Sequence, residues 1–372
     1  MEKIILKNSV IRKWYNFPIR VEFDEENIIL KFSNKELYTQ KEYEDGKKYL
    51  IFLAGEIGKG EEIEFKIEKS ESSPEIVKVV DDKNGKVDVF INETLFTTYN
   101  YSLEYSRPFL NPVIGPSGKS IVRKSASPGN PEKFDHIHHR GIWVAHGDVN
   151  GTDNWSELEG HGKTIHRRFI NLISGPVFGL IHSLNDWIDN KGRKLLEEER
   201  IIKIYNLPSD NRIIDHTIIL RATETEVIFK DTKESGLLSI RVNPEMEGRN
   251  TGLIKNSYGG EGEKECWGKR AFWCDYSGQI EGIECGISVF DFPGNLRYPT
   301  YWHVRDYGLF SANFFGLSDF YGDKKISGTY ILPYGNELKL FYRIYIHSGN
   351  CEQAKVNEKY LNFLYPPEIE VK

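Results

Sequence analysis

Alternating apolar and polar residues, the pattern of half-buried β-strands, recur along most of the chain. Residues 76–92 hold two such runs around Asn84 and Gly85, a pair typical of a hairpin turn. Residues 212–230 predict two consecutive strands, and residues 337–347 predict another. In that last run, the residues expected on one face are Leu338, Leu340, Tyr342, Ile344 and Ile346, and those expected on the other are Lys339, Phe341, Arg343, Tyr345 and His347.

Signals for helices are few, and the best covers residues 350–364, where apolar residues recur at helical spacing. Asn350 is a suitable N-cap for this helix, and Pro366 ends the pattern. Many short strands joined by turns that contain Gly and Asn favour a large antiparallel β-sandwich. We therefore expect an all-β protein with few helices, one of them C-terminal. The P-loop and the dinucleotide-binding glycine motif are both absent from the sequence.

A candidate boundary lies at residues 69–75, which are polar and include a proline. Short strands are predicted before it, at residues 49–55 and 61–68. We expect residues 1–72 to form a small β region, either separate from the main sandwich or integral to it. Residues 73–372 are then the main sandwich, which carries the functional site.

Composition excludes several classes of partner. The formal net charge is -6 and the sequence shows no basic stripe, so we expect no nucleic-acid partner. The strongest apolar run, residues 50–54, is too short to span a bilayer, and the N-terminus lacks the features of a signal peptide. The 4 cysteines lack CxxC spacing, which indicates reduced thiols. We expect a cytoplasmic protein without a membrane partner, and a homo-oligomer is left open.

The segment 134–155 holds four of the chain's 10 histidines, namely His136, His138, His139 and His146. In an extended chain His136 and His138 point the same way, as ligands of a transition metal could, and His146 with Asp148 could complete a site. The spacing nevertheless matches neither HExxH nor a structural zinc motif. Acid–base chemistry without a metal is a second interpretation, since histidine titrates near neutrality. A buried polar network is the third.

Other polar candidates lie in three further segments, each also rich in aromatic residues, Gly or Pro. If the chain after Pro299 is a strand, one face carries Tyr301, His303, Arg305 and Tyr307. A face with a histidine and an arginine is costly to bury as core, which favours the lining of a pocket. The Gly-containing segment 256–278 adds Glu261, Trp267 and Arg270. The Pro- and Gly-rich segment 104–123 adds Arg107, for which a salt bridge is an equally good explanation.

Four runs of sequence resemble a bacterial family of unknown function that carries the label "methane oxygenase PmoA". These runs are RPFLNPVIGPSG (107–118), DHIHHRGIWVAHGDVNGTDNW (135–155), WGKRAFWCDYSG (267–278) and NLRYPTYWHVRDYG (295–308). The chain departs from the family pattern at Ile137, where proline is expected, and at Asn154, where an aromatic residue is usual. The label refers to a membrane copper enzyme, whereas this sequence has no apolar run of spanning length.

The resemblance implies a galactose-mutarotase-like β-supersandwich, which agrees with the strand pattern. Relatives of that fold bind a sugar on the concave face of the large sheet, and use a histidine as general acid and a carboxylate as base. We therefore expect an epimerase, lyase or hydrolase that acts on a sugar or sugar acid and needs no cofactor. His303 or His146 would be the acid, and Glu261 or Asp148 the base.

The remaining candidates would bind the substrate, a small-molecule carbohydrate. Hydroxyls or a carboxylate would be held by Arg107, His139, Arg140 and Arg305, and the rings stacked on the sugar would be Trp143 and Trp267. A non-catalytic sugar-binding module is the alternative, since a fold does not fix a function. A second alternative is an oxygenase or hydrolase that holds a divalent transition metal on His136, His138 and His146. The first two interpretations require these distant segments to line one hollow.

Overall fold

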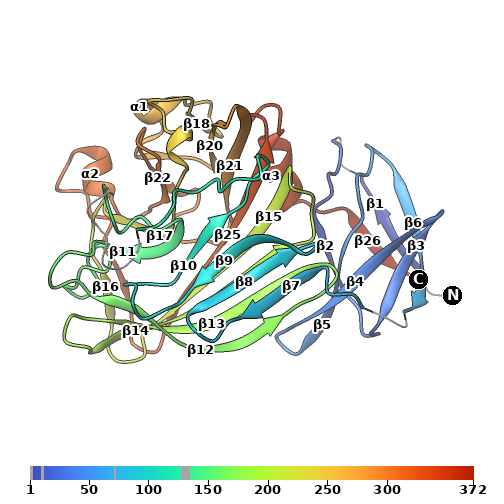
Figure 1. The fold of residues 1–372 in the computed structure, drawn as a ribbon, viewed down its shortest axis with the longest axis horizontal. Coiled ribbons are helices and arrows are strands. Elements are labelled where there is room, and N and C mark those ends of the chain that lie inside the picture. The colour runs from blue at the N-terminus through green and yellow to red at the C-terminus, as the bar shows by residue number, and fades with distance from the viewer. Residues whose placement is uncertain (1–2, 10–11, 71–72, 127–134) are drawn as a thin grey trace.

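The computed structural model describes residues 3–9, 12–70, 73–126 and 135–372, and within them the strands form three large antiparallel sheets and a two-stranded ribbon (Figure 1). The all-β class and the sandwich architecture expected from the sequence are confirmed. In spatial order the nine-stranded sheet consists of β19 (Lys269–Arg270), β22 (Tyr301–Val304), β23 (Leu309–Ala312), β17 (Ser235–Arg241), β11 (Ile142–His146), β10 (Phe109–Val113), β9 (Thr94–Asn100), β8 (Lys86–Ile91) and β7 (Val77–Asp81).

The eight-stranded sheet packs against the nine-stranded sheet. Its strands in spatial order are β12 (Lys163–Ile173), β13 (Phe178–Ile188), β14 (Lys194–Tyr205), β15 (Asn211–Arg221), β25 (Glu337–Ser348), β21 (Ile283–Asp291), β20 (Trp273–Ile280) and β18 (Leu253–Asn256). The ribbon is formed by β16 (Val227–Phe229) and β24 (Tyr330–Leu332). The hairpin predicted at Gly85 is the β7–β8 turn, where a φ of 106° suits glycine.

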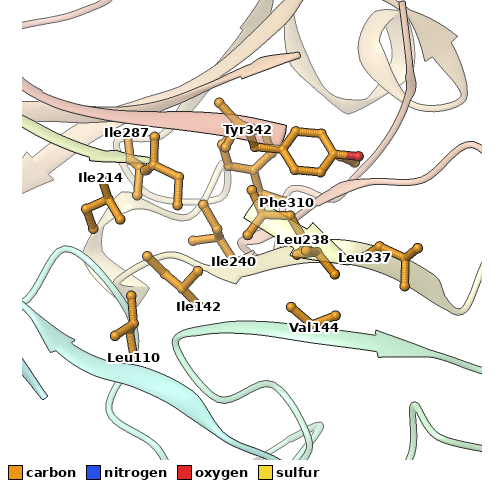
Figure 2. Close-up of a cluster of buried hydrophobic side chains, with 14 of the residues drawn as sticks. Leu110, Ile142, Val144, Ile214, Leu237, Leu238, Ile240, Ile287, Phe310 and Tyr342 are labelled. Carbon is orange, nitrogen blue, oxygen red and sulfur yellow. The ribbon is translucent and has the colours of Figure 1, made fainter. Parts of the chain in front are cut away.

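The main core lies between these two sheets, because alternate residues of each sheet face the other. Figure 2 shows Ile142, Val144, Ile240 and Phe310 of the nine-stranded sheet and Ile214, Ile287 and Tyr342 of the eight-stranded sheet in one apolar cluster. The face of residues 337–347 that was predicted to be apolar is buried in this core. The intervening residues of β11, β17, β22 and β23 therefore point to the opposite, outer face of the nine-stranded sheet.

The third sheet joins the two ends of the described chain (Figure 1). Its strands in spatial order are β2 (Pro18–Glu22), β5 (Lys47–Leu53), β4 (Lys35–Glu44), β3 (Ile28–Phe32), β6 (Glu62–Lys69), β1 (Lys3–Lys7) and β26 (Glu368–Val371). A second apolar core packs this N-terminal sheet on Phe178, Ile213 and Tyr345 of the eight-stranded sheet. The division into two domains at residue 72 stays a prediction.

Helices are short in the described residues: α1 (Gly262–Cys266), α2 (Leu317–Tyr321) and α3 (Val356–Leu364). The C-terminal helix is confirmed, but it begins at Val356 instead of Asn350. The Asn350 Oδ1 atom accepts hydrogen bonds from the N–H groups of Glu352 and Gln353, which closes a turn before the helix starts. None of the described helices is long and apolar enough to cross a lipid bilayer.

Candidate functional site

The outer face of the nine-stranded sheet carries a row of paired residues from strands that are far apart in the sequence. His303 of β22 pairs with Ser311 of β23, and Ser311 pairs with Ser239 of β17. Ser239 pairs with Trp143 of β11, and Trp143 pairs with Phe109 of β10. The Ser311 hydroxyl donates to the Ser239 hydroxyl at 2.8 Å. This row brings three of the segments singled out in the sequence onto one surface.

The loop that begins at Asp135 covers part of this face. The ring of His139 stacks on Trp143 with centroids 5.2 Å apart, and its Nδ1 atom lies 3.0 Å from a guanidinium nitrogen of Arg241. The ring of His136 stacks on Tyr307 at 5.1 Å. The guanidinium group of Arg241 also lies over the Tyr307 ring, at 4.8 Å. Arg241 and Tyr307 therefore both contact the loop that begins at Asp135, and Tyr307 belongs to the turn after β22.

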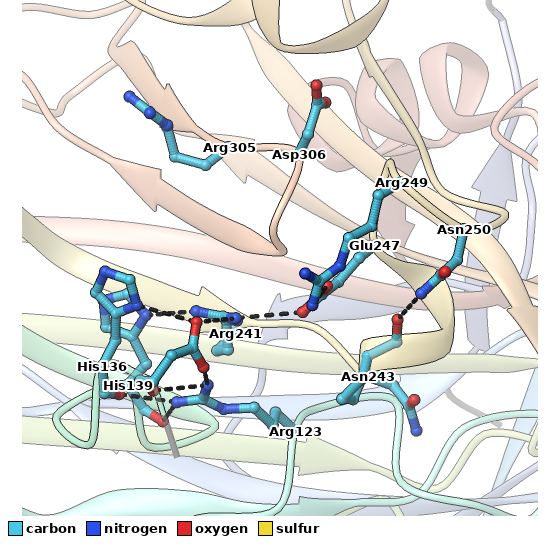
Figure 3. Close-up of polar contacts among 12 residues, drawn as sticks. Arg123, His136, His139, Arg241, Asn243, Glu247, Arg249, Asn250, Arg305 and Asp306 are labelled. Atoms are coloured by element: carbon cyan, nitrogen blue, oxygen red, sulfur yellow. Dashed lines mark hydrogen bonds and ion pairs between the residues drawn. The ribbon is translucent and has the colours of Figure 1, made fainter. Parts of the chain in front are cut away.

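Arg241 is the centre of a network of arginines and carboxylates (Figure 3). Its NH2 group donates to Asp135 and to Glu247, each at 3.2 Å, and Glu247 also pairs with Arg249 at 2.5 Å. Arg123 donates to the carboxylate of Asp135 at 2.5 Å. Burial opposes ionisation of Asp135, but Arg241 and Arg123 outweigh it and lower the pKa of that carboxyl to about 2.

A second, largely buried ion pair fixes the next stretch of the same loop. Glu157 accepts two hydrogen bonds from Arg140, from Nε at 2.7 Å and from NH2 at 2.5 Å, and Arg107 lies 3.9 Å away. Arg107 donates to the carbonyl of His138 at 3.2 Å. Burial lowers the pKa of His138 to about 3, so this histidine is neutral at pH 7. Both arginines were predicted to bind substrate, and here they hold protein groups.

His303 lies in an aromatic pocket on the outer face. The indole N–H of Trp267 donates to its Nδ1 atom at 3.2 Å, and the ring of Phe320 lies 6.3 Å away. Burial lowers the pKa of His303 to about 3. Because Nδ1 accepts a hydrogen bond, the neutral ring carries its proton on Nε2. Two residues further on, Arg305 pairs with Glu263 at 3.1 Å, and both of these side chains are partly exposed.

Three of the predicted catalytic residues lie apart from His303. His146 is completely buried and packs against Phe229 and Phe315, and burial lowers its pKa to about 4. Asp148 pairs with a lysine of the loop after β16, at 3.2 Å. Glu261 pairs at 2.7 Å with a lysine of β18, at the edge of the eight-stranded sheet. Their catalytic roles stay predictions, and one carboxylate that contacts the His303 segment is Glu263.

The three histidines of the metal alternative do not converge. The rings of His136 and His138 have centroids 5.8 Å apart, whereas His146 lies in its own aromatic pocket. Among the residues that the structure describes, no three His, Cys, Asp or Glu side chains are grouped so that they could hold a metal ion. Trp143, predicted to stack on a sugar, is completely buried between His139 and Trp155.

Residues 86–361 match the model of a family described as a family of unknown function, DUF6807. The chain belongs to this family. The family description states no activity and does not carry the methane-oxygenase label. No curated protein matches the chain.

The DUF6807 protein is also similar to solved structures of carbohydrate enzymes, at low identity. A protein in glycosyl hydrolase family 38 from Enterococcus faecalis is 9% identical with a TM-score of 0.43, and the likeness covers 100% of this chain and 47% of that one. An alpha-mannosidase from Enterococcus faecalis V583 is 8% identical with a TM-score of 0.44, and the likeness covers 100% of this chain and 46% of that one. The alpha-galactosidase from Lactobacillus brevis is 12% identical with a TM-score of 0.31, and the likeness covers 75% of this chain and 39% of that one. The chain thus spans less than half the length of each of these proteins.

Sequence reasoning about this DUF6807 protein missed several groups of the site. Arg241 and Glu247 received no role, although a lone arginine at the end of the apolar strand 235–241 is a signal that could have been used. Glu263 was not singled out, because it lies in a run of charged residues that is typical of a solvated surface turn. Asp135 and Arg123 lie inside quoted motifs, but nothing local indicates that both contact the Arg241 network, since Asp135 and Arg241 are separated by 106 positions.

Proposed function

We propose that this DUF6807 protein binds a carbohydrate on the outer face of the nine-stranded sheet and acts on it by acid–base chemistry. The observation that carries the proposal is that the short segment from His303 to Tyr307 contacts Trp267 at one end and the loop that begins at Asp135, through His136, at the other. Partly exposed aromatic rings suit the C–H faces of a sugar, while the neighbouring charged groups suit its hydroxyls.

The proposed roles follow from the protonation states. A neutral His303 donates from Nε2 to a hydroxyl or carbonyl oxygen of the sugar, and so polarises it. Glu263, held by Arg305, accepts a proton from the substrate. Trp267 fixes the orientation of His303 and offers the part of its ring that is exposed to the ligand.

The experiment is a panel of aldoses and uronates incubated with the protein and followed by polarimetry and NMR. We expect turnover of at least one member, reduced on the order of 100-fold or more in His303→Gln and in Glu263→Gln. His182→Gln is the matched control, because His182 pairs with Glu199 on the eight-stranded sheet. If no sugar is turned over and none binds, the proposal is wrong.

A non-catalytic sugar-binding module is the second candidate, and one observation favours it. The described ionisable groups beside the site are held neutral by burial, as in His303, or paired, as in Glu263. Groups fixed in this way suit hydrogen bonding at least as well as proton transfer. Binding of a sugar that is weakened in His303→Gln, with no turnover of any panel member, supports this candidate over the enzyme.

A further inference from the structure

Next to the Arg241 network lies a cavity of about 430 Å³. This volume is within the range of about 300–1,000 Å³ that is typical of small-molecule sites. Part of its wall is formed by Asn243 and Pro244, at the start of the 3-10 turn Pro244–Met246. The charged residues that line the cavity are Arg123, Lys124, Asp135, Arg241, Glu247 and Arg249.

The lining of this cavity is positive although the whole chain is acidic. Four cationic side chains against two carboxylates leave a net charge of +2, whereas the formal charge of the chain is -6. Arg241 and Arg123 are buried, with 1% and 5% of their surface exposed. Burial and repulsion by the neighbouring Arg241 together lower the pKa of Arg123 to about 10.

One of the cations can bind a ligand without breaking the buried network. The side chain of Arg249 is 71% exposed, and its partner Glu247 is also bound by Arg241. Arg249 can therefore turn from Glu247 to an incoming anion while Arg241 keeps Glu247 paired. A guanidinium group binds a carboxylate or a phosphate through two parallel hydrogen bonds, which makes arginine a suitable group for such ligands.

The cavity also adjoins the proposed sugar site. Arg241 contacts His139 through NH1 at 3.0 Å and Glu247 through NH2 at 3.2 Å, and it lies over the ring of Tyr307. One guanidinium group thus connects the outer face with the cavity. A ligand on that face with an anionic substituent can place the substituent among Arg123, Arg241 and Arg249.

We infer that the cavity binds an oxyanion, the carboxylate or phosphate group of a small carbohydrate, so that sugar acids or sugar phosphates are preferred over neutral sugars. The carbohydrate part of this inference rests on the proposed function above. The preference follows from the positive lining, because an anionic substituent is attracted by the exposed cations Lys124 and Arg249 whereas a neutral sugar is not.

Calorimetric titration with glucuronate, glucose 6-phosphate, glucose and inorganic phosphate tests the inference. We expect at least one of the two anionic sugars to bind at least 10-fold more tightly than glucose. This advantage should fall at least 10-fold in Arg249→Gln. The matched control is Arg167→Gln, which removes a guanidinium of similar exposure from β12. Thermal melts of both variants confirm that they are folded.

The outcomes separate the two proposals. Glucose that binds as tightly as both anionic sugars overturns the anion site and leaves the proposed function standing. Inorganic phosphate that binds in an Arg249-dependent way, with no sugar bound, supports the anion site and contradicts the proposed function. If no ligand binds, both are wrong. Preference for glucuronate identifies a carboxylate as the anion, and preference for glucose 6-phosphate identifies a phosphate.

Discussion

At the scale of single residues, the site depends on groups held in one protonation state. The indole N–H of Trp267 fixes the tautomer of His303, and burial keeps the ring neutral. Elsewhere burial acts on a carboxyl: Asp291, the last residue of β21, accepts hydrogen bonds from Asn295 and from the N–H of Thr300. Burial nevertheless raises the pKa of Asp291 to about 7. Each case gives a test on one side chain.

Replacement of Trp267 by Phe tests the tautomer of His303. The phenyl ring keeps most of the contact with Phe320 but has no N–H to donate, so protonation of Nδ1 no longer breaks a hydrogen bond. We expect the pKa of His303 to rise from about 3 by somewhat less than one unit, because a hydrogen bond contributes about 1 kcal/mol. Nitrogen-15 NMR of the imidazole against pH measures it. Trp273→Phe is the control, since that indole donates to Asn357 instead. An unchanged tautomer and pKa in Trp267→Phe would contradict this role.

The raised pKa of Asp291 predicts that this carboxyl lowers the free energy of unfolding as pH rises. The unfolded carboxyl titrates near 4 and the folded one near 7, so its contribution to stability is fully present below pH 4 and is lost as pH rises through 7. The full cost is about 4 kcal/mol at most. Asp291→Asn removes the titrating group and with it this loss of stability. We therefore expect the variant to become more stable relative to the parent protein as pH rises from 4 to 8. Urea denaturation measures it, and Asp323→Asn, an exposed aspartate, should show no such trend.

At the scale of elements, two loops over the outer face are tied to each other by a buried ion pair. Arg140, before β11, and Glu157, after the same strand, form two hydrogen bonds, and the ring of Tyr105 lies 4.9 Å from the Arg140 guanidinium. The backbone carbonyls bound by Arg107 belong to the same two loops. The position of the His138–His139 segment thus depends on charges that are largely buried.

Removal of the negative charge in Glu157→Gln should therefore destabilise the fold. The change leaves Arg140 and Arg107 buried without a counter-ion, which typically costs about 3–5 kcal/mol. Unfolding in guanidinium chloride measures the loss. Glu159→Gln serves as control because Glu159 is an exposed neighbour in the same loop. Equal stability of the two variants would show that the pair does not hold the loops.

Local patterns predicted much of the fold at this scale, and the failures have physical reasons. Alternation predicted the strand at residues 337–347 and the face that enters the main core, but it did not predict that Arg343 and Tyr345 on the other face are also buried, because they lie under the N-terminal sheet. It also predicted one continuous strand for residues 301–307, but β22 ends at Val304. The N–H of Gly308 bonds to the carbonyl of Arg305 and closes a turn, which places Tyr307 beside His136. The partners of Arg241 could not be predicted, since they depend on which strands become neighbours.

At the scale of the whole molecule, many histidines are buried in neutral form. Burial lowers the pKa of each of His138, His139, His146, His166, His216 and His303. Each binds a proton more readily in the unfolded chain, where the pKa is about 6.5. Because their folded pKa values are depressed, their contribution to stability is present above pH 6.5 and is lost as pH falls towards the folded values.

Acid should therefore unfold the protein well above the pH at which its carboxylates are protonated. Each such histidine contributes a slope of about 1.4 kcal/mol per pH unit, and several of them together exceed the opposite slope of Asp291. We expect the urea midpoint to fall steeply between pH 6.5 and 4.5. The fall of the midpoint with pH should be less steep in His216→Asn. His216 is suitable because it is buried on β15, away from the proposed site. A flat midpoint over this range would contradict the prediction.

The pairing of β26 with β1 also has a consequence for the order of folding during synthesis. Ile4 pairs with Val371, so β1 is the border strand of the N-terminal sheet until residues 368–371 have been synthesised and β26 takes that place. Until then β1 presents unpaired backbone groups, which are a template for contact with other nascent chains. Chaperone dependence should therefore be greatest for polypeptides stalled just short of residue 368.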